Sequence, residues 1–365
     1  MIPRQYISVV LFILPLYYLT RSFSRFYGLF HEHSGIAITQ AEVVRGHAFG
    51  NSSYLGEGIG KEEEHKQVIP KIIHQVWHNW NGGQDRDLDN QTLPEDWEKL
   101  RGTCKALNPG WEFRLWTEKT SREFLALNYS WFLKTYDGYR HPVQRADTIR
   151  YFLMRHYGGI YLDLDNGCNA PLKPLLALPV FITDSGTRSL PNNIMGATPS
   201  HPFFTLLTNS LHSYSYNYVF PYMTVAYASG QWFLTAIWEQ YHGMVSVAAS
   251  LNEEEGGEWE VLGVKSDMRL HRVMMEEGKE DEWALFSKGR GGNWVRWDNR
   301  VFGWVEDHVI LVPLILGAWV MALLGMGASI LKFLKRFSRT ETRRRARGRA
   351  RGRFVKLRGK EDDEV

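Results

Sequence analysis

Apolar residues form two uninterrupted runs, one on each side of a longer segment of mixed pattern. The first run, YISVVLFILPLYYLT over residues 6–20, has 15 residues and is flanked by arginines. A helix that crosses a membrane needs about 20 apolar residues, with about 17 as a common minimum, so this run is short. No small-residue cleavage site follows it, which favours an uncleaved signal anchor over a cleaved signal peptide. We therefore assign residues 1–28 to an N-terminal anchor.

The second run, residues 309–331, contains 23 residues without a charge. It is long enough to span a membrane, and its small residues are typical of membrane helices, although a buried core helix is the alternative. Residues 332–365 follow with 14 Lys and Arg against 5 Asp and Glu. Because positive flanks stay cytoplasmic, we expect a cytosolic basic tail and a luminal segment between the two runs.

The segment between the runs changes pattern near residue 68. Residues 29–67 are polar and without periodicity, which is typical of a stem. Residues 72–77 and 111–116 alternate in polarity and predict strands, and a helical pattern opens at Thr120 and Ser121. Strands that alternate with helices predict an α/β domain over residues 68–305.

Residues 143–165 (VQRADTIRYFLMRHYGGIYLDLD) hold the most informative pattern. A helix is expected over residues 146–157, ended by two glycines, and a buried strand over residues 160–164. The period of two sends alternate residues of the strand to opposite sides, with Ile160, Leu162 and Leu164 on one and Tyr161, Asp163 and Asp165 on the other. Two carboxylates thus reach the carboxyl edge of a sheet, where α/β folds bind ligands.

These carboxylates suggest a metal site. Mn²⁺ and Mg²⁺ prefer oxygen ligands and keep waters and substrate phosphates, so Asp163 and Asp165 suit a cation that holds a nucleotide diphosphate. Solvated turn carboxylates are the simpler alternative. Asp147 and Arg150 lie one helical turn apart and form either a surface ion pair or a clamp for sugar hydroxyls and phosphate oxygens.

Four blocks together resemble one family: IPKIIHQVWHNW (69–80), RADTIRYFLMRHYGGIYLDLDNGC (145–168), NNIMGATPSHPFF (192–204) and YMTVAYASGQWFLTAIWEQY (222–241). They are similar to the catalytic subunits of fungal mannosyl inositol phosphorylceramide synthases. These enzymes are DxD glycosyltransferases of family 32, related to the Golgi initiating α-1,6-mannosyltransferase. The resemblance implies a single Rossmann-like GT-A domain, flanked here by two transmembrane helices. It also implies retaining, metal-dependent transfer of mannose from GDP-mannose to inositol phosphorylceramide.

The resemblance also assigns the site. Asp163, Asp165 and Arg150 would be catalytic. Asp165 would bind Mn²⁺ or Mg²⁺, and Asp163 would bind the same metal or the nucleotide ribose. The expected donor contacts, in chain order, are Trp77, Asp147, Arg150, Asp163, Asn293 and Trp294. Trp77 would stack on the nucleotide base, with simple core packing as the alternative.

The loop assigned to the diphosphate departs from the family pattern. Asn293 and Trp294 would close over the diphosphate, as in related enzymes. Gly292 stands where relatives often have Ser, and Val295 where His commonly follows the Trp. One metal or phosphate contact of this loop therefore stays open.

Further expectations concern location and partners. The formal net charge of +3 combines a mildly acidic segment with the basic tail. Arg/Gly repeats can bind nucleic acid, but their place after a predicted span favours anionic lipids, so no nucleic-acid partner is expected. The resemblance implies a multi-pass Golgi membrane protein, with a multi-span regulatory subunit as a possible partner. A Golgi α-1,6-mannosyltransferase of protein N-glycans is the alternative function.

Two features bear on an oxidising lumen. Cys104 and Cys168 are the only cysteines, so they either pair or stay free. Asn51, Asn90 and Asn128 begin glycosylation sequons, which support a luminal location only weakly.

Overall fold

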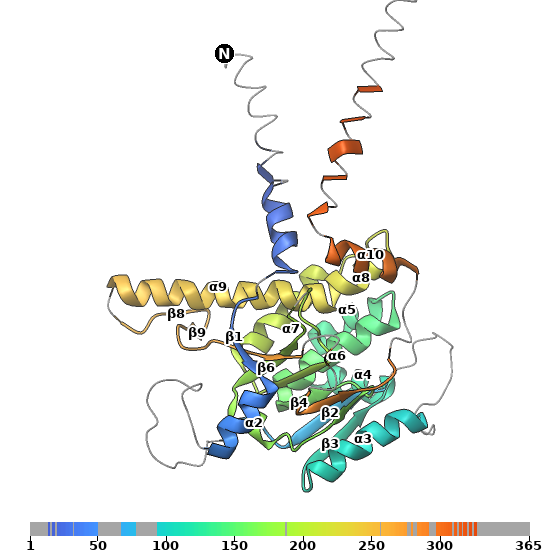
Figure 1. The fold of residues 1–365 in the computed structure, drawn as a ribbon, viewed down its shortest axis with the longest axis vertical. Coiled ribbons are helices and arrows are strands. Elements are labelled where there is room, and N and C mark those ends of the chain that lie inside the picture. Colours follow the sequence, from blue (N-terminus) through green and yellow to red (C-terminus); the bar gives the residue numbers. More distant parts are fainter. Residues whose placement is uncertain are drawn as a thin grey trace, which may run out of the picture. The chain divides into compact units, whose positions relative to one another are not determined.

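Figure 1 shows the fold in a computed structural model. Apart from scattered positions in the apolar runs and residue 279, the structure describes residues 20–31, 33–49, 67–77, 93–186, 188–255, 257–275, 283–291 and 297–308. Residues 1–306 form one compact unit, and residues 307–365 form a second. All contacts discussed below lie within the first unit.

A seven-stranded sheet organises the first unit. Its strands, in order across the sheet, are β1 (Ile36–Thr39), β10 (His271–Met274), β6 (Val180–Asp184), β7 (Ile194–Ala197), β4 (Gly159–Leu162), β2 (Ile72–Val76) and β3 (Glu112–Trp116). Neighbouring strands are parallel, except that β7 is antiparallel to both β6 and β4. Six strands therefore share one direction, and their carboxyl ends meet at one edge. This confirms the predicted α/β class.

Helices cover both faces of the sheet (Figure 1). They are α2 (Gln40–Phe49), α3 (Glu95–Leu107), α4 (Glu118–Asn128), α5 (Leu133–Gly138), α6 (Pro142–Tyr157), α7 (Pro202–Tyr214), α8 (Pro221–Ala228), α9 (Gln231–Glu255) and α10 (Trp297–Asp307). One hydrophobic cluster joins Tyr161 to α4, α5, α6, α7 and α9, and the other joins Ile160 and Leu162 to α2 and α3. The predicted alternation is thus confirmed for residues 160–162.

The described residues of this unit also form four shorter strands and two short 3₁₀ helices. The 3₁₀ helices span Ser130–Phe132 and Lys173–Ala177. Strand β8 (Glu260–Val261) pairs with β9 (Val264–Lys265), and β5 (Asn166–Cys168) pairs with β11 (Phe286–Lys288), both antiparallel. The second pair lies directly after the two predicted metal ligands and so bears on the site.

The predicted helices exist but begin earlier than expected. Helix α4 starts at Glu118, because Thr117 and Thr120 cap its first turn reciprocally. Helix α6 starts at Pro142, four residues before the expected start, since proline suits the first turn, where its missing N–H has no helical partner. Capping residues rather than hydrophobic periodicity therefore set both starts.

Two glycines allow β4 to follow α6 without a connecting loop. The helix ends at Tyr157, and Gly158 and Gly159 have φ angles of 63° and 88°. A Cβ on Gly158 would lie 2.6 Å from the carbonyl oxygen of Ala197, and one on Gly159 would lie 2.6 Å from that of Ile72. The pair therefore ends the helix, as predicted from the sequence, and it also lets β4 enter between β7 and β2.

The expected stem, residues 29–67, contributes part of the sheet. Strand β1 pairs in parallel with β10, and the N–H of Ile36 donates to the carbonyl of Leu270 at 2.8 Å. The indole N–H of Trp238 donates to the carbonyl of Ser34, also at 2.8 Å. The folded unit therefore begins before the expected boundary at residue 68. The sequence did not indicate this strand, because four residues are too few to show periodicity.

The predicted membrane helices, residues 1–28 and 309–331, fall largely outside the described residues, and the tail, residues 332–365, falls wholly outside them. Among the positions that the structure does describe, no helix has the length and hydrophobicity needed to cross a bilayer. Of the three sequons, Asn128 is exposed at the end of α4, and the other two also fall outside the described part of the chain.

Cys104 and Cys168 form a disulfide, which settles the alternative left open by the sequence. Both residues are buried, and the bond joins α3 to β5. The Cys168 N–H also donates to the Thr103 hydroxyl at 2.9 Å. The bond therefore fixes the segment three residues beyond Asp165.

The double variant Cys104→Ser, Cys168→Ser should be markedly less stable. The bond closes a loop with a sequence separation of 64, for which the chain-entropy estimate is about 4 kcal/mol. Denaturant unfolding of the full chain measures the loss, and wild-type protein unfolded in reductant is the matched control. An unchanged midpoint in the variant would contradict the prediction.

Candidate active site

The predicted metal ligands lie in a tight turn at the carboxyl end of β4. The strand ends one residue before Asp163, and the Asn166 N–H donates to the Asp163 carbonyl at 3.0 Å, so the expected strand to residue 164 is too long. The Asp163 N–H donates to the carbonyl of Asn193 at 2.9 Å. The Asp165 carbonyl accepts from the N–H of Gly289 at 2.7 Å. Both aspartates therefore project from a backbone held on two sides.

Arg150 is a buried cation between two carboxylates. Its guanidinium nitrogens lie 3.3 Å from Asp147 Oδ1 and 3.4 Å from Asp163 Oδ1, and Nη1 donates to the Asn192 carbonyl at 2.7 Å. The guanidinium also lies over the Tyr161 ring, 4.7 Å from its centroid. Arg150 and Asp147 are each 4% exposed, so the alternative of a surface ion pair is wrong.

Charge compensation holds this cluster together. Burial alone would lower the pKa of Arg150, but the neighbouring negative charge, that of Asp163 first, raises it. Burial raises the pKa of Asp147, and the charge of Arg150 opposes that shift. Asp147 also accepts from the Asn192 side-chain amide at 3.0 Å and from the Ser229 hydroxyl at 3.1 Å. Each buried charge therefore has a charged partner as well as hydrogen bonds.

Four residues that support this cluster were not assigned from the sequence. The Tyr161 hydroxyl donates to Asp163 Oδ1 at 2.5 Å, and the Tyr151 hydroxyl donates to the Ser229 carbonyl at 2.7 Å. The Asn192 amide also donates to the Tyr151 hydroxyl at 2.9 Å. Strand alternation had placed Tyr161 on the side of Asp163, but no local signal connects Asn192 and Ser229 to the distant α6.

The turn fits a hard divalent cation. Burial, and then the charge of Asp163, raises the pKa of Asp165 to about 6, and the charges of Arg150 and Lys288 oppose this shift only in part. Asp165 Oδ1 accepts from the Asn166 amide at 2.8 Å. Within the described ranges, no cluster of three or more His, Cys, Asp or Glu side chains completes a metal cage. A cation here would take its other ligands from water and phosphate.

A cavity of about 350 Å³ lies at the same sheet edge. Amide and hydroxyl side chains make up much of its wall, together with two cations and one carboxylate. The polar and charged lining residues are Asn166, Thr183, Ser185, Arg188, Ser189, Asn193, Tyr222, Gln231, Lys288, Asn299 and Glu306. Such a lining suits a hydroxyl-rich, anionic ligand.

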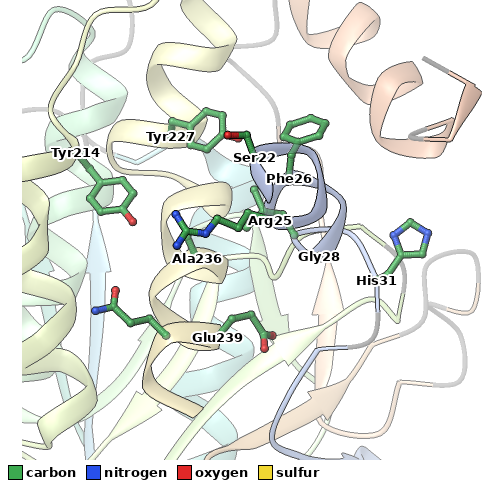
Figure 2. A pocket seen from close by; sticks show the side chains of 11 residues that line it. Ser22, Arg25, Phe26, Gly28, His31, Tyr214, Tyr227, Ala236 and Glu239 are labelled. Atoms are coloured by element: carbon green, nitrogen blue, oxygen red, sulfur yellow. The ribbon is translucent and has the colours of Figure 1, made fainter. Parts of the chain in front are cut away.

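A larger cavity, of about 940 Å³, lies between residues 22–31 and α9. Figure 2 shows Arg25 in it, with Tyr227 and Tyr214 on one side and Glu239 on the other. Its lining contains none of the predicted site residues. Volume alone therefore does not identify the active site here, whereas the paired carboxylates do.

The remaining predicted contacts differ in their outcome. Trp77 follows β2, and the parallel pairing of β2 with β4 brings it to the sheet edge of Asp163. Its backbone N–H donates to the Trp116 carbonyl at 2.8 Å, and the residue as a whole is 9% exposed. Asn293 and Trp294 lie outside the described residues.

Comparison with known proteins gives the class of this site. Residues 94–182 match the family described as "Glycosyltransferase sugar-binding region containing DXD motif". That range includes the buried Arg150 cluster and both aspartates of the turn. The protein is a DXD glycosyltransferase.

Longer relatives define the family more closely. Inositol phosphoceramide mannosyltransferase 1 of Schizosaccharomyces pombe is 31% identical over 66% of this chain and 67% of its own length, and mannosyltransferase 2 is 41% identical over 67% and 64%. Mannosyl phosphorylinositol ceramide synthase CSH1 of Saccharomyces cerevisiae is 33% identical over 75% and 63%. The chain belongs to the family of these inositol phosphoceramide mannosyltransferases. It spans about half to two thirds of the length of the curated relatives that it matches.

Replacing Arg150 by Ala should destabilise the protein strongly. The change leaves Asp147 buried without its cation, a situation that typically costs about 3–5 kcal/mol. Thermal unfolding of the full-length protein should show a midpoint lower by several degrees. The control is Arg122→Ala, which breaks an exposed pair with Asp137 and should change little. Equal midpoints for the two variants would contradict this account of the buried cluster.

Proposed function

We propose that the protein transfers mannose from GDP-mannose to inositol phosphorylceramide, with retention of configuration, in sphingolipid synthesis. The family and the buried Arg150 cluster beside the DxD turn support this proposal. The donor sugar and the metal follow from the family resemblance, because the turn by itself suits any nucleotide diphosphate sugar. We further propose that the parallel-rich sheet is a GT-A domain flanked by two membrane helices.

The proposed donor site uses residues that the turn brings together. Asp163 and Asp165 would hold Mn²⁺ or Mg²⁺, which supplies positive charge to the donor diphosphate when bound. Arg150 would add a positive charge on the sugar side, held there by Asp147. Trp77 would contact the base, with Asn293 and Trp294 over the diphosphate.

The proposed reaction exchanges one bond at the sugar. The bond from mannose C1 to the β-phosphate oxygen breaks, and GDP leaves with the electron pair. An acceptor hydroxyl oxygen forms a new bond to C1 from the same face, and its proton passes to the departing phosphate oxygen. The proposal therefore needs no enzymic nucleophile, only residues that stabilise charge and fix geometry.

Location and partners complete the proposal. We place the catalytic domain in the Golgi lumen, with both termini cytosolic and a multi-span regulatory subunit as a partner. The disulfide supports an oxidising compartment, since such bonds are rare in the cytosol. The 23-residue uncharged run supports a second span, which would keep the domain near lipid headgroups.

The double variant Asp163→Asn, Asp165→Asn should abolish mannose transfer without unfolding the domain. The metal would lose both carboxylates, whereas Arg150 would keep the buried Asp147 as its partner. Transfer assays and thermal unfolding measure the two effects, with the exposed Asp137→Asn as control. Full activity in the double variant would disprove the assigned metal site.

The acceptor is tested by lipid analysis of a strain that lacks the gene. Loss of mannosylated inositol phosphorylceramide, with accumulation of its precursor, is the expected result. Normal sphingolipids together with truncated protein N-glycans would contradict this proposal. That result would favour the alternative function, a Golgi α-1,6-mannosyltransferase of protein N-glycans. Re-expression of the wild-type chain should restore the lipid, and re-expression of the double aspartate variant should not.

A further inference from the structure

One loop lines the 350 Å³ cavity and also contacts the residues of the proposed donor site. Residues 185–193 connect β6 to β7 at the carboxyl edge of the sheet. At the loop's end, Asn192 binds Arg150 and Asn193 binds the Asp163 backbone. Earlier in the same loop, Arg188 and Ser189 line the cavity. The loop therefore places Arg188 in the cavity wall, four residues before the Asn192 that contacts Arg150.

The backbone of Arg188 is held in an unfavourable conformation. Its φ is 70°, in the left-handed region that a long side chain rarely adopts. The buried His33 donates from Nε2 to the Arg188 carbonyl at 2.8 Å, and its Nδ1 lies 3.5 Å from Glu239 Oε1. Glu239 also accepts from the backbone N–H of Ser34 at 3.1 Å and from its hydroxyl at 2.6 Å. Strain that the surroundings hold in place is characteristic of functional positions.

The two cations of the cavity face different neighbours. Lys288 ends β11 and pairs with Asn166 of β5, the residue directly after Asp165. Arg188 comes from the β6–β7 loop and lines the cavity together with Tyr222 of α8 and Glu306 of α10. The Arg188 charge also lowers the pKa of Tyr222, which burial and Glu306 raise. Lys288 therefore lies beside the turn assigned to the metal and diphosphate, and Arg188 lies on the side of α8 and α10.

We propose that Arg188 binds the phosphodiester of the lipid acceptor, and that His33 is the positioning residue that aims it. A guanidinium suits a phosphate because it can donate two parallel hydrogen bonds. The neighbouring side chains of Gln231, Asn299 and Glu306 then meet the hydroxyls of the polyol headgroup. This inference rests on the proposed function and names the group by which the site selects a phosphorylated acceptor.

The test compares acceptor use with donor use in the full-length enzyme in detergent micelles. Arg188→Gln should raise the KM for inositol phosphorylceramide about 10- to 100-fold, as expected for the loss of a charged hydrogen bond. The KM for GDP-mannose and the rate of GDP-mannose hydrolysis without acceptor should stay unchanged. Arg122→Gln, on the surface, is the matched control.

Competition by headgroup fragments identifies the phosphate. Wild-type enzyme should be inhibited more strongly by myo-inositol 1-phosphate than by myo-inositol, and Arg188→Gln should remove this difference. His33→Ala should raise the acceptor KM in the same direction. His33→Gln, whose amide can still donate to the Arg188 carbonyl, should restore part of it, which a merely structural role in folding does not predict.

Three results separate the possibilities. An unchanged acceptor KM in Arg188→Gln overturns the inference and leaves the proposed function intact. A raised donor KM with slower donor hydrolysis also overturns it, because Arg188 then serves the donor diphosphate. A wild-type enzyme that hydrolyses GDP-mannose but gives no transfer to inositol phosphorylceramide overturns the proposed function and this inference together.

Discussion

The buried guanidinium of Arg150 constrains the arrangement around it. Arginine does not lose its proton in proteins, so its burial must be balanced by carboxylates and acceptors. Here Asp147 comes from the same helix, Asp163 from the end of β4, and a carbonyl from the loop before β7. Ser229, after α8, then binds the second oxygen of Asp147. One charge thus sets the positions of four separate segments, and Arg150 and the Tyr161 hydroxyl together orient the first aspartate of the DxD turn.

That arrangement depends on where β4 begins. Because Gly158 and Gly159 permit contacts with two neighbouring backbones, β4 enters the sheet directly after α6. The helix that bears Arg150 and the turn that bears Asp163 are therefore separated by only one short strand. A longer connection would separate the cation from its second carboxylate. The two glycines consequently matter for the electrostatics of the site as well as for the chain reversal.

Sequence patterns predicted the features that are local in the chain. Alternation placed Tyr161 and Asp163 on one side, and one helical turn brought Asp147 to Arg150. The strand was predicted to continue to residue 164, but it ends at Leu162 and the chain turns. The prediction was wrong because the hydrogen bond between Asn166 and Asp163 that closes the turn leaves no periodic pattern in the sequence. Asn192 and Ser229 were missed as well, since their partners lie 45 and 82 residues away. Such contacts depend on tertiary structure, which periodicity does not encode.

The same limit applies to the start of the folded unit, and it has a physical consequence. Residues 33–39 belong to the segment that the sequence predicted as a stem, yet they supply an edge strand of the sheet. His33 also donates to the carbonyl of Arg188, 155 residues further along the chain. At the other end of the unit, Glu306 accepts from the hydroxyl of Tyr222 at 2.8 Å and from the indole N–H of Trp232 at 2.9 Å. The cavity walls thus join both ends of the unit. Contacts between segments so far apart in sequence cost loop-closure entropy, so we expect this cavity to form more slowly than the local unit of α6 and β4.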